Sequence, residues 1–128
     1  MNLIKPFLYV GIGGFLGSIA RYALHMMITN KLTPPFPWGT FVVNITGCLL
    51  IGLLVGLETK TQLVSDPLKW LVIVGFCGGF TTFSTFSIEG LGLLHQQQYA
   101  TFFTYVTGSV AVGLLATFAG FSLIRQAL

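Results

Sequence analysis

The residues best suited to chemistry lie in one run of the chain, Gly75-Phe76-Cys77-Gly78-Gly79-Phe80-Thr81-Thr82-Phe83-Ser84-Thr85-Phe86-Ser87. A Thr-Phe-Ser triplet occurs there twice in succession, at 82–84 and 85–87, so on a helix the hydroxyl groups and phenyl rings form neighbouring stripes. Phenyl rings have a positive edge and hydroxyl groups are donors. Together they can replace part of the water around an anion without a fixed charge, which is the moderate binding that ion passage requires.

A less functional interpretation of the triplets stays open. Phe83 and Phe86 could pack in a hydrophobic core while the hydroxyl groups bond back to carbonyl groups of their own helix. In that case the run would carry no ion.

The adjacent glycines Gly78 and Gly79, followed by β-branched Thr81 and Thr82, predict an interruption of the helix near its middle. Backbone carbonyls freed by a break at membrane depth cost several kcal/mol each, about as much as other unpaired polar groups, unless protein, water or an ion satisfies them. The break is therefore a candidate cation site. The alternative is a continuous helix in which the glycines only allow close packing.

Composition indicates the elements that must position this run. Of the 128 residues, 54% are hydrophobic and only 7% are charged, a composition that a soluble domain of this size does not have. A membrane-spanning helix needs roughly 20 apolar residues, so the chain has room for four helices and little else. We expect one all-α membrane domain over 1–128, with spans at about Phe7–Met27, Thr40–Leu57, Trp70–Leu94 and Thr101–Leu123.

Four spans place both termini and the second link on one side of the membrane. The cations on that side are Lys5, Lys60, Lys69 and Arg125, against Arg21 and Lys31 on the other. This bias is too small to fix an orientation by the positive-inside rule, and it permits an assembly of two oppositely oriented copies. A single orientation with cytoplasmic termini remains the alternative. The net charge of +3 is too thinly spread to indicate nucleic acid.

Glycines at small-xxx-small spacing, Gly13 with Gly17 and Gly52 with Gly56, predict helix faces that approach closely. For any one pair, packing within the chain is the expected arrangement. Because four short spans offer few internal partners, we expect some small-residue faces to pack between copies.

Polar side chains gather in the half of the membrane where span two starts and span three ends. They are Arg21, Asn44, Ser84, Thr85, Glu89, Tyr105 and Ser109. Asn44 is able to donate to an anion, or to bond a neighbouring helix. Arg21 and Glu89 could pair with each other or flank a water-filled vestibule, since lone charges at this depth are costly.

The run Gly75–Ser87, together with Trp38-Gly39-Thr40, Asn44 and an arginine after a glycine-rich first span, resembles the Fluc (CrcB) family of fluoride channels. The resemblance covers the whole chain in span order and length. It implies an antiparallel, dual-topology homodimer in the bacterial inner membrane, with two pores that passively export toxic fluoride. It also implies a structural sodium ion that is not transported.

The resemblance assigns roles by matching positions. The implied fluoride pathway contains Thr40, Asn44, Phe83, Ser84, Thr85, Phe86, Tyr105 and Ser109; the vestibule contains Arg21 and Glu89; and the backbone carbonyls of Gly78 and Thr81 hold sodium. The chain departs from the family pattern at Gly113, where a hydroxyl of the span-four track is found in relatives, and at Phe80, where leucine is frequent.

Other classes of protein remain to be distinguished. The chain has no nucleophile and base pair and no phosphate loop, so we do not expect an enzyme. A small proton-coupled drug or cation exporter would need a membrane-embedded carboxylate, and the first span has none. A membrane subunit without transport is the third possibility. Cys48 and Cys77 are interpreted as small buried residues.

Overall fold

The computed structural model describes residues 2–128, and within these residues it contains helices and no strand. The elements are α1 (Ile4–Thr29), α2 (Trp38–Thr61), α3 (Asp66–Leu68), the π-helical segment η1 (Lys69–Cys77), α4 (Gly78–Phe80), α5 (Ser84–His95) and α6 (Tyr99–Ala127). Four stretches are long and apolar enough to cross a membrane: α1, α2, the stretch 66–95, and α6. The all-α class with four apolar helices is therefore confirmed.

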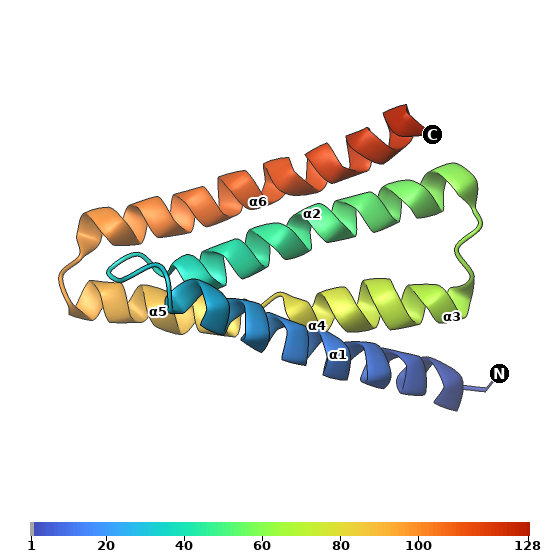
Figure 1. The fold of residues 1–128 in the computed structure, drawn as a ribbon, viewed down its shortest axis with the longest axis horizontal. Coiled ribbons are helices and arrows are strands. Elements are labelled where there is room, and N and C mark those ends of the chain that lie inside the picture. The colour runs from blue at the N-terminus through green and yellow to red at the C-terminus, as the bar shows by residue number, and fades with distance from the viewer. Residues whose placement is uncertain (1) are drawn as a thin grey trace.

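The four long stretches lie side by side and alternate in direction (Figure 1). Both termini and the link between α2 and α3 lie at one end of the molecule, and the other two links lie at the opposite end. Each helical stretch contains one of the predicted spans and continues past it at both ends. At the C-terminal ends of α2 and α6, Lys60 and Arg125 lie in the last turn, where a cation interacts favourably with the helix dipole.

Helix α1 packs against η1 through glycine. A Cβ atom on Gly13 would lie 1.9 Å from the carbonyl oxygen of Leu71, and one on Gly17 would lie 2.2 Å from that of Phe76. Real Cβ atoms do not approach so closely, so only glycine allows these two backbones to touch.

Helix α2 packs against α6 in the same way. A Cβ atom on Gly52 would lie 2.2 Å from the carbonyl oxygen of Thr117, and one on Gly56 would lie 2.9 Å from that of Phe121. Both predicted glycine pairs therefore pack inside the chain. This is the packing within one chain that was expected for any single pair. Packing of other small-residue faces between copies stays a prediction.

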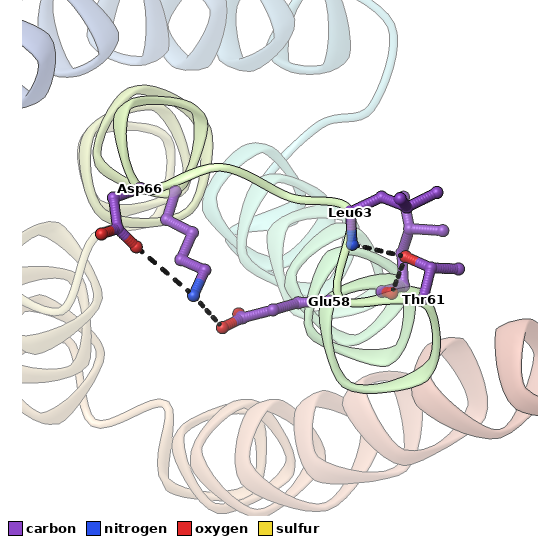
Figure 2. A network of polar contacts seen from close by, with 6 residues as sticks. Glu58, Thr61, Leu63 and Asp66 are labelled. Atoms are coloured by element: carbon purple, nitrogen blue, oxygen red, sulfur yellow. Dashed lines mark hydrogen bonds and ion pairs between the residues drawn. The ribbon is translucent and has the colours of Figure 1, made fainter.

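The link between α2 and α3 is charged and is bridged by salt bridges (Figure 2). The Nζ of Lys69 lies 2.8 Å from a carboxylate oxygen of Glu58 and 3.7 Å from one of Asp66. At the chain turn, the backbone N–H of Leu63 donates to the hydroxyl of Thr61 at 3.3 Å. These contacts join the second span to the third, although exposed ion pairs contribute little to stability.

The third span is interrupted, as predicted. Helix α4 ends at Phe80, Thr81 is extended with φ −84° and ψ 158°, and α5 begins at Ser84. The gap lies between α4 and α5 in Figure 1, near the middle of the molecule. Residues 81–83 therefore run outside the helix at the depth where backbone polar groups most need partners.

Candidate functional site

One side chain of α2 satisfies a peptide group at the break. In a continuous helix the N–H of Thr82 would donate to the carbonyl of Gly78. Instead it donates to Oδ1 of Asn44 at 2.8 Å, and Nδ2 of Asn44 donates to the carbonyl of Thr82 at 2.9 Å. The carbonyl of Gly78 therefore does not receive the hydrogen bond from Thr82 that it would have in a helix.

A second backbone N–H, about one turn later, also donates to a side chain and not to a helical carbonyl. The N–H of Thr85, which a helix would direct to the carbonyl of Thr81, donates to the hydroxyl of Thr82 at 3.2 Å. The carbonyls of Gly78 and Thr81 thus both lose their helical donors. These are the two carbonyls that the resemblance assigns to sodium.

Arg21 of α1 forms a hydrogen bond with the carbonyl of Gly79, which lies between Gly78 and Thr81 in the sequence. Its Nε donates to the carbonyl oxygen of Gly79 at 3.0 Å, and the backbones meet because a Cβ atom on Gly79 would lie 2.6 Å from the carbonyl of Gly14. Within residues 2–128 Arg21 forms no ion pair with Glu89, so pairing of these two charges, one of the two expected alternatives, is wrong. Glu89 instead accepts a hydrogen bond of 2.5 Å from the hydroxyl of Thr40.

A cavity of about 390 Å³ opens beside the break. Its walls are mostly apolar, with an amide and a few hydroxyl groups. The residues that line it include Asn44, Cys48, Cys77, Gly78, Thr81, Thr82, Phe83, Phe86 and Ser109. Six of the predicted site residues, from three different spans, are thus brought to one cavity.

Two further cavities lead from the break toward the link between α1 and α2. The first, about 230 Å³, is lined by Arg21, Tyr22, His25, Thr40, Val43, Thr82 and Thr85. The second, about 460 Å³, lies under the proline-rich link and includes Glu89 and His25 in its wall. Thr82 borders the first two cavities and His25 borders the last two, so the three form a series along the bundle.

Aromatic rings from the break, from α5 and from α6 are arranged beside this series. The ring centroids of Phe83 and Phe86 are 5.6 Å apart, and those of Phe86 and Tyr105 are 5.0 Å apart. Phe83 is 79% exposed, whereas Tyr105 is fully buried. Within the single chain, Phe83 is therefore not a core residue, while Phe86 is part of an aromatic cluster.

Two hydroxyl groups of α6 are buried without a partner. Neither the hydroxyl of Tyr105 nor that of Ser109 makes a hydrogen bond within the described part of the chain. Buried polar groups are normally paired, so unpaired ones mark places where water or an ion supplies the missing partner. Further along α6, Thr117 bonds back to the carbonyl of Gly113 at 3.1 Å and adds no free hydroxyl there.

The hydroxyl groups around the break follow both expected patterns. Thr81 bonds back to the carbonyl of Cys77 in the preceding turn, at 3.1 Å. The hydroxyl of Thr82 instead contacts those of Ser84 and Thr85, at 3.3 and 3.2 Å. Ser84 and Tyr105 line none of the three cavities, so their place beside the series is through Thr82 and Phe86 respectively.

Thr82 is the residue that the sequence reasoning missed. The sequence places it at the break and in a hydroxyl stripe but gives it no role in the site, whereas in the structure both its backbone and its side chain organise the break. Its position shortly after the adjacent glycines Gly78 and Gly79 is the signal in the sequence that could have singled it out.

Fold and site together define a multi-pass membrane protein with a helix broken at mid-span and a series of partly polar cavities through the bundle. Comparison with known proteins then identifies the family. The model of the family described as CrcB-like protein, Camphor Resistance (CrcB), matches residues 8–121, and the chain belongs to this family.

Several relatives are similar over nearly their whole length. A protein of Phocaeicola vulgatus is 46% identical over 117 residues, covering 91% of this chain and 96% of its own. One of Flavobacterium psychrophilum is 44% identical over 123 residues, covering 96% and 99%. One of Rhizobium etli is 39% identical over 118 residues, covering 92% and 94%. Each is named a fluoride-specific ion channel, FluC. Membership of a family of channels agrees with the expectation that the chain is not an enzyme.

Proposed function

We propose that the chain is a fluoride-selective channel that passively exports fluoride across the bacterial inner membrane. The names of its relatives support the ion, and the cavity at the break supports the route. The observation that carries the proposal is that Asn44, Phe83, Phe86 and Ser109 line one cavity of about 390 Å³. One amide hydrogen of Asn44, a buried unpaired hydroxyl and phenyl edges offer an anion partial replacement of its water.

The route would run through the three cavities in turn. Glu89 and Arg21 stand in the walls of the outer two, where water could enter from the end that carries the α1–α2 link. Thr40, Thr85 and Thr82 supply hydroxyl groups before the aromatic cavity. Ser109 adds a buried hydroxyl to the wall of the aromatic cavity. Tyr105 and Ser84 stand behind the route, in contact with Phe86 and Thr82 respectively.

A structural sodium ion at the carbonyls of Gly78 and Thr81 is the second part of the proposal. Hard cations prefer oxygen ligands, usually about six or more for an ion of this size. Both carbonyls have lost their helical donors, and both residues stand in the wall of the cavity beside the break, which leaves room for an ion. Two carbonyls from one chain are too few for a full set of ligands.

The third part is an antiparallel homodimer of dual topology, with two pores. A second, inverted copy would supply a further pair of carbonyls. It would also cover the exposed ring of Phe83 and the apolar residues of the cavity mouth. The remaining apolar surface, on α1 and α6 for example, suits contact with lipid.

Flux from liposomes tests the proposal. Purified protein is reconstituted into vesicles loaded with potassium fluoride or potassium chloride, and valinomycin balances the charge during efflux. We expect rapid fluoride efflux and no protein-dependent chloride efflux. Efflux that needs a proton gradient and carries a drug cation would indicate an exporter, and absence of any flux would indicate a subunit; either result contradicts the proposal.

Orientation is tested separately. A short epitope is placed after Leu128, and its accessibility is measured from each side of the cell membrane in intact and opened cells. Dual topology predicts labelling of about half the molecules from each side. Labelling from one side alone would contradict the antiparallel dimer without affecting the flux result.

A further inference from the structure

We infer that Arg21 is a positioning residue for the cation site, which acts through a backbone carbonyl of the break rather than as an attractive charge in the vestibule. The inference rests on the proposed sodium site. It concerns how that site is kept in shape, and it gives Arg21 a role that the resemblance does not.

The contact is specific in atom and place. It is the Nε of Arg21 that donates, at 3.0 Å, and the acceptor is the carbonyl of Gly79, which lies in sequence between the proposed ligands Gly78 and Thr81. The contact joins residues 58 positions apart and is partly buried. A charge that served only to attract ions would have no need of this bond.

The bond also fixes which carbonyls remain for the ion. A continuous helix would pair the carbonyl of Gly79 with the N–H of Phe83. With Arg21 on that carbonyl, the peptide group between Gly79 and Phe80 is held in one orientation. The carbonyl of Gly79 is then not available for a helical hydrogen bond across the break. It also does not turn toward the cation in place of the carbonyl of Gly78 or Thr81.

Three side chains each change the hydrogen bonding of one carbonyl at the break. Asn44 accepts the hydrogen bond that the N–H of Thr82 would otherwise donate to the carbonyl of Gly78. The hydroxyl of Thr82 accepts the bond that the N–H of Thr85 would otherwise donate to the carbonyl of Thr81. Arg21 takes the intervening carbonyl out of competition. Loss of the Arg21 bond should therefore weaken cation binding even where the charge is kept.

Two substitutions separate the donor from the charge. Counted along the side chain, the Nε of arginine occupies the position of the amide nitrogen of glutamine and of the Cε methylene of lysine. Arg21→Gln thus keeps a donor at that position and removes the charge. Arg21→Lys keeps the charge and places a methylene group where the bond is made, and Arg21→Met removes both.

The experiment measures cation binding in two ways. In detergent, the unfolding temperature is followed against sodium concentration, with N-methylglucamine as the replacement cation, because a bound ligand raises stability by an amount set by its concentration. In liposomes, the sodium concentration that gives half of the maximal fluoride flux is determined. Lys31→Gln is the matched control, because it removes a cation from the link that follows α1, the helix that carries Arg21.

We expect Arg21→Lys and Arg21→Met to require about tenfold more sodium in both measurements, as loss of one hydrogen bond to a charged group implies. Arg21→Gln and Lys31→Gln should need about as much as the unchanged protein. A uniform drop of the unfolding temperature at every sodium concentration would show a merely structural role and would overturn the inference.

The opposite order would also overturn it. If Arg21→Lys behaves as the unchanged protein while Arg21→Gln loses flux at all sodium concentrations, Arg21 acts as a vestibule charge. If the unchanged protein responds to sodium in neither measurement, the proposed sodium site is wrong and the role of Arg21 falls with it. If it responds and Arg21→Lys responds identically, only the inference about Arg21 fails.

Discussion

Asn44 forms hydrogen bonds with both backbone polar atoms of Thr82, one at 2.8 Å and one at 2.9 Å. The amide therefore imitates the pairing that a residue of a neighbouring antiparallel strand would give, and it does so at a residue outside any helix. One of its two N–H groups is used in this way. The same side chain stands in the wall of the cavity, so structural support and ion contact come from one residue.

Asn44→Ala should remove both bonds and leave the peptide polar atoms of Thr82 without these partners. Each hydrogen bond contributes about 1 kcal/mol, and an unpaired buried group costs about 1–3 kcal/mol. We expect a loss of stability of that order, because the break is no longer held, and a fall of fluoride flux of at least about tenfold.

The matched control is Thr46→Ala on the same helix, where the hydroxyl bonds only to the carbonyl of Val42 in the preceding turn. Thermal unfolding in detergent and efflux from liposomes give the two readouts. Normal flux in Asn44→Ala would contradict its place in the site.

Phe83→Ile and Phe86→Ile should slow or abolish fluoride flux while leaving assembly largely intact, because isoleucine lacks the positive ring edge. The two should differ in stability. Phe83 is 79% exposed, whereas Phe86 packs on Tyr105 with ring centroids 5.0 Å apart. Loss of that aromatic contact costs about 0.5–1.5 kcal/mol.

Phe103→Ile serves as control, since this ring is 64% exposed on α6 and lines none of the three cavities. Gel filtration reports assembly and a fluoride electrode reports flux. Should both cavity variants conduct as well as the control, the rings have no part in the pathway.

The general architecture could be predicted from the sequence because it depends on properties that each segment carries alone. Apolar length predicts the four helices, and adjacent glycines followed by Thr81 and Thr82 predict the break. Partners of polar groups are another matter, since they depend on the register of helices far apart in the chain. Arg21 and Asn44 find backbone groups 58 and 38 residues away, which no local pattern specifies.

The helix that each glycine face contacts could not be predicted, for a related reason. Small-xxx-small spacing shows that a helix face permits close approach, but not which helix approaches. Gly13 and Gly52 both meet carbonyl oxygens of the same chain. Ion identity is likewise beyond the residues themselves, and it comes from the relatives.

Thr40→Val should destabilise the fold by about 1.5–3 kcal/mol, the usual contribution of a hydrogen bond to a charged group. Thr40 is 2% exposed and donates the 2.5 Å bond to the carboxylate of Glu89. Valine has the same shape without the donor. We expect reduced flux as well, since the bond lies between the two outer cavities.

Thr40→Ser keeps the hydroxyl and should recover most of both losses. Unfolding temperature and liposome efflux are compared across the three proteins. Equal stability of the valine and serine variants would show that the bond from residue 40 to Glu89 does not stabilise the protein.

Gly13→Ala should prevent close packing of α1 on η1, because its new Cβ atom would lie 1.9 Å from the carbonyl oxygen of Leu71. Backbone cannot yield as a flexible side chain does, so the cost should reach or exceed the roughly 1–3 kcal/mol of ordinary overpacking. Gly11→Ala, two residues away, meets nothing within 4 Å and should be neutral or slightly stabilising. Because α1 also carries Arg21 to the break, Gly13→Ala should raise the sodium requirement as well as lower the unfolding temperature. Similar unfolding temperatures for the two alanine variants would show that α1 and η1 are not in backbone contact.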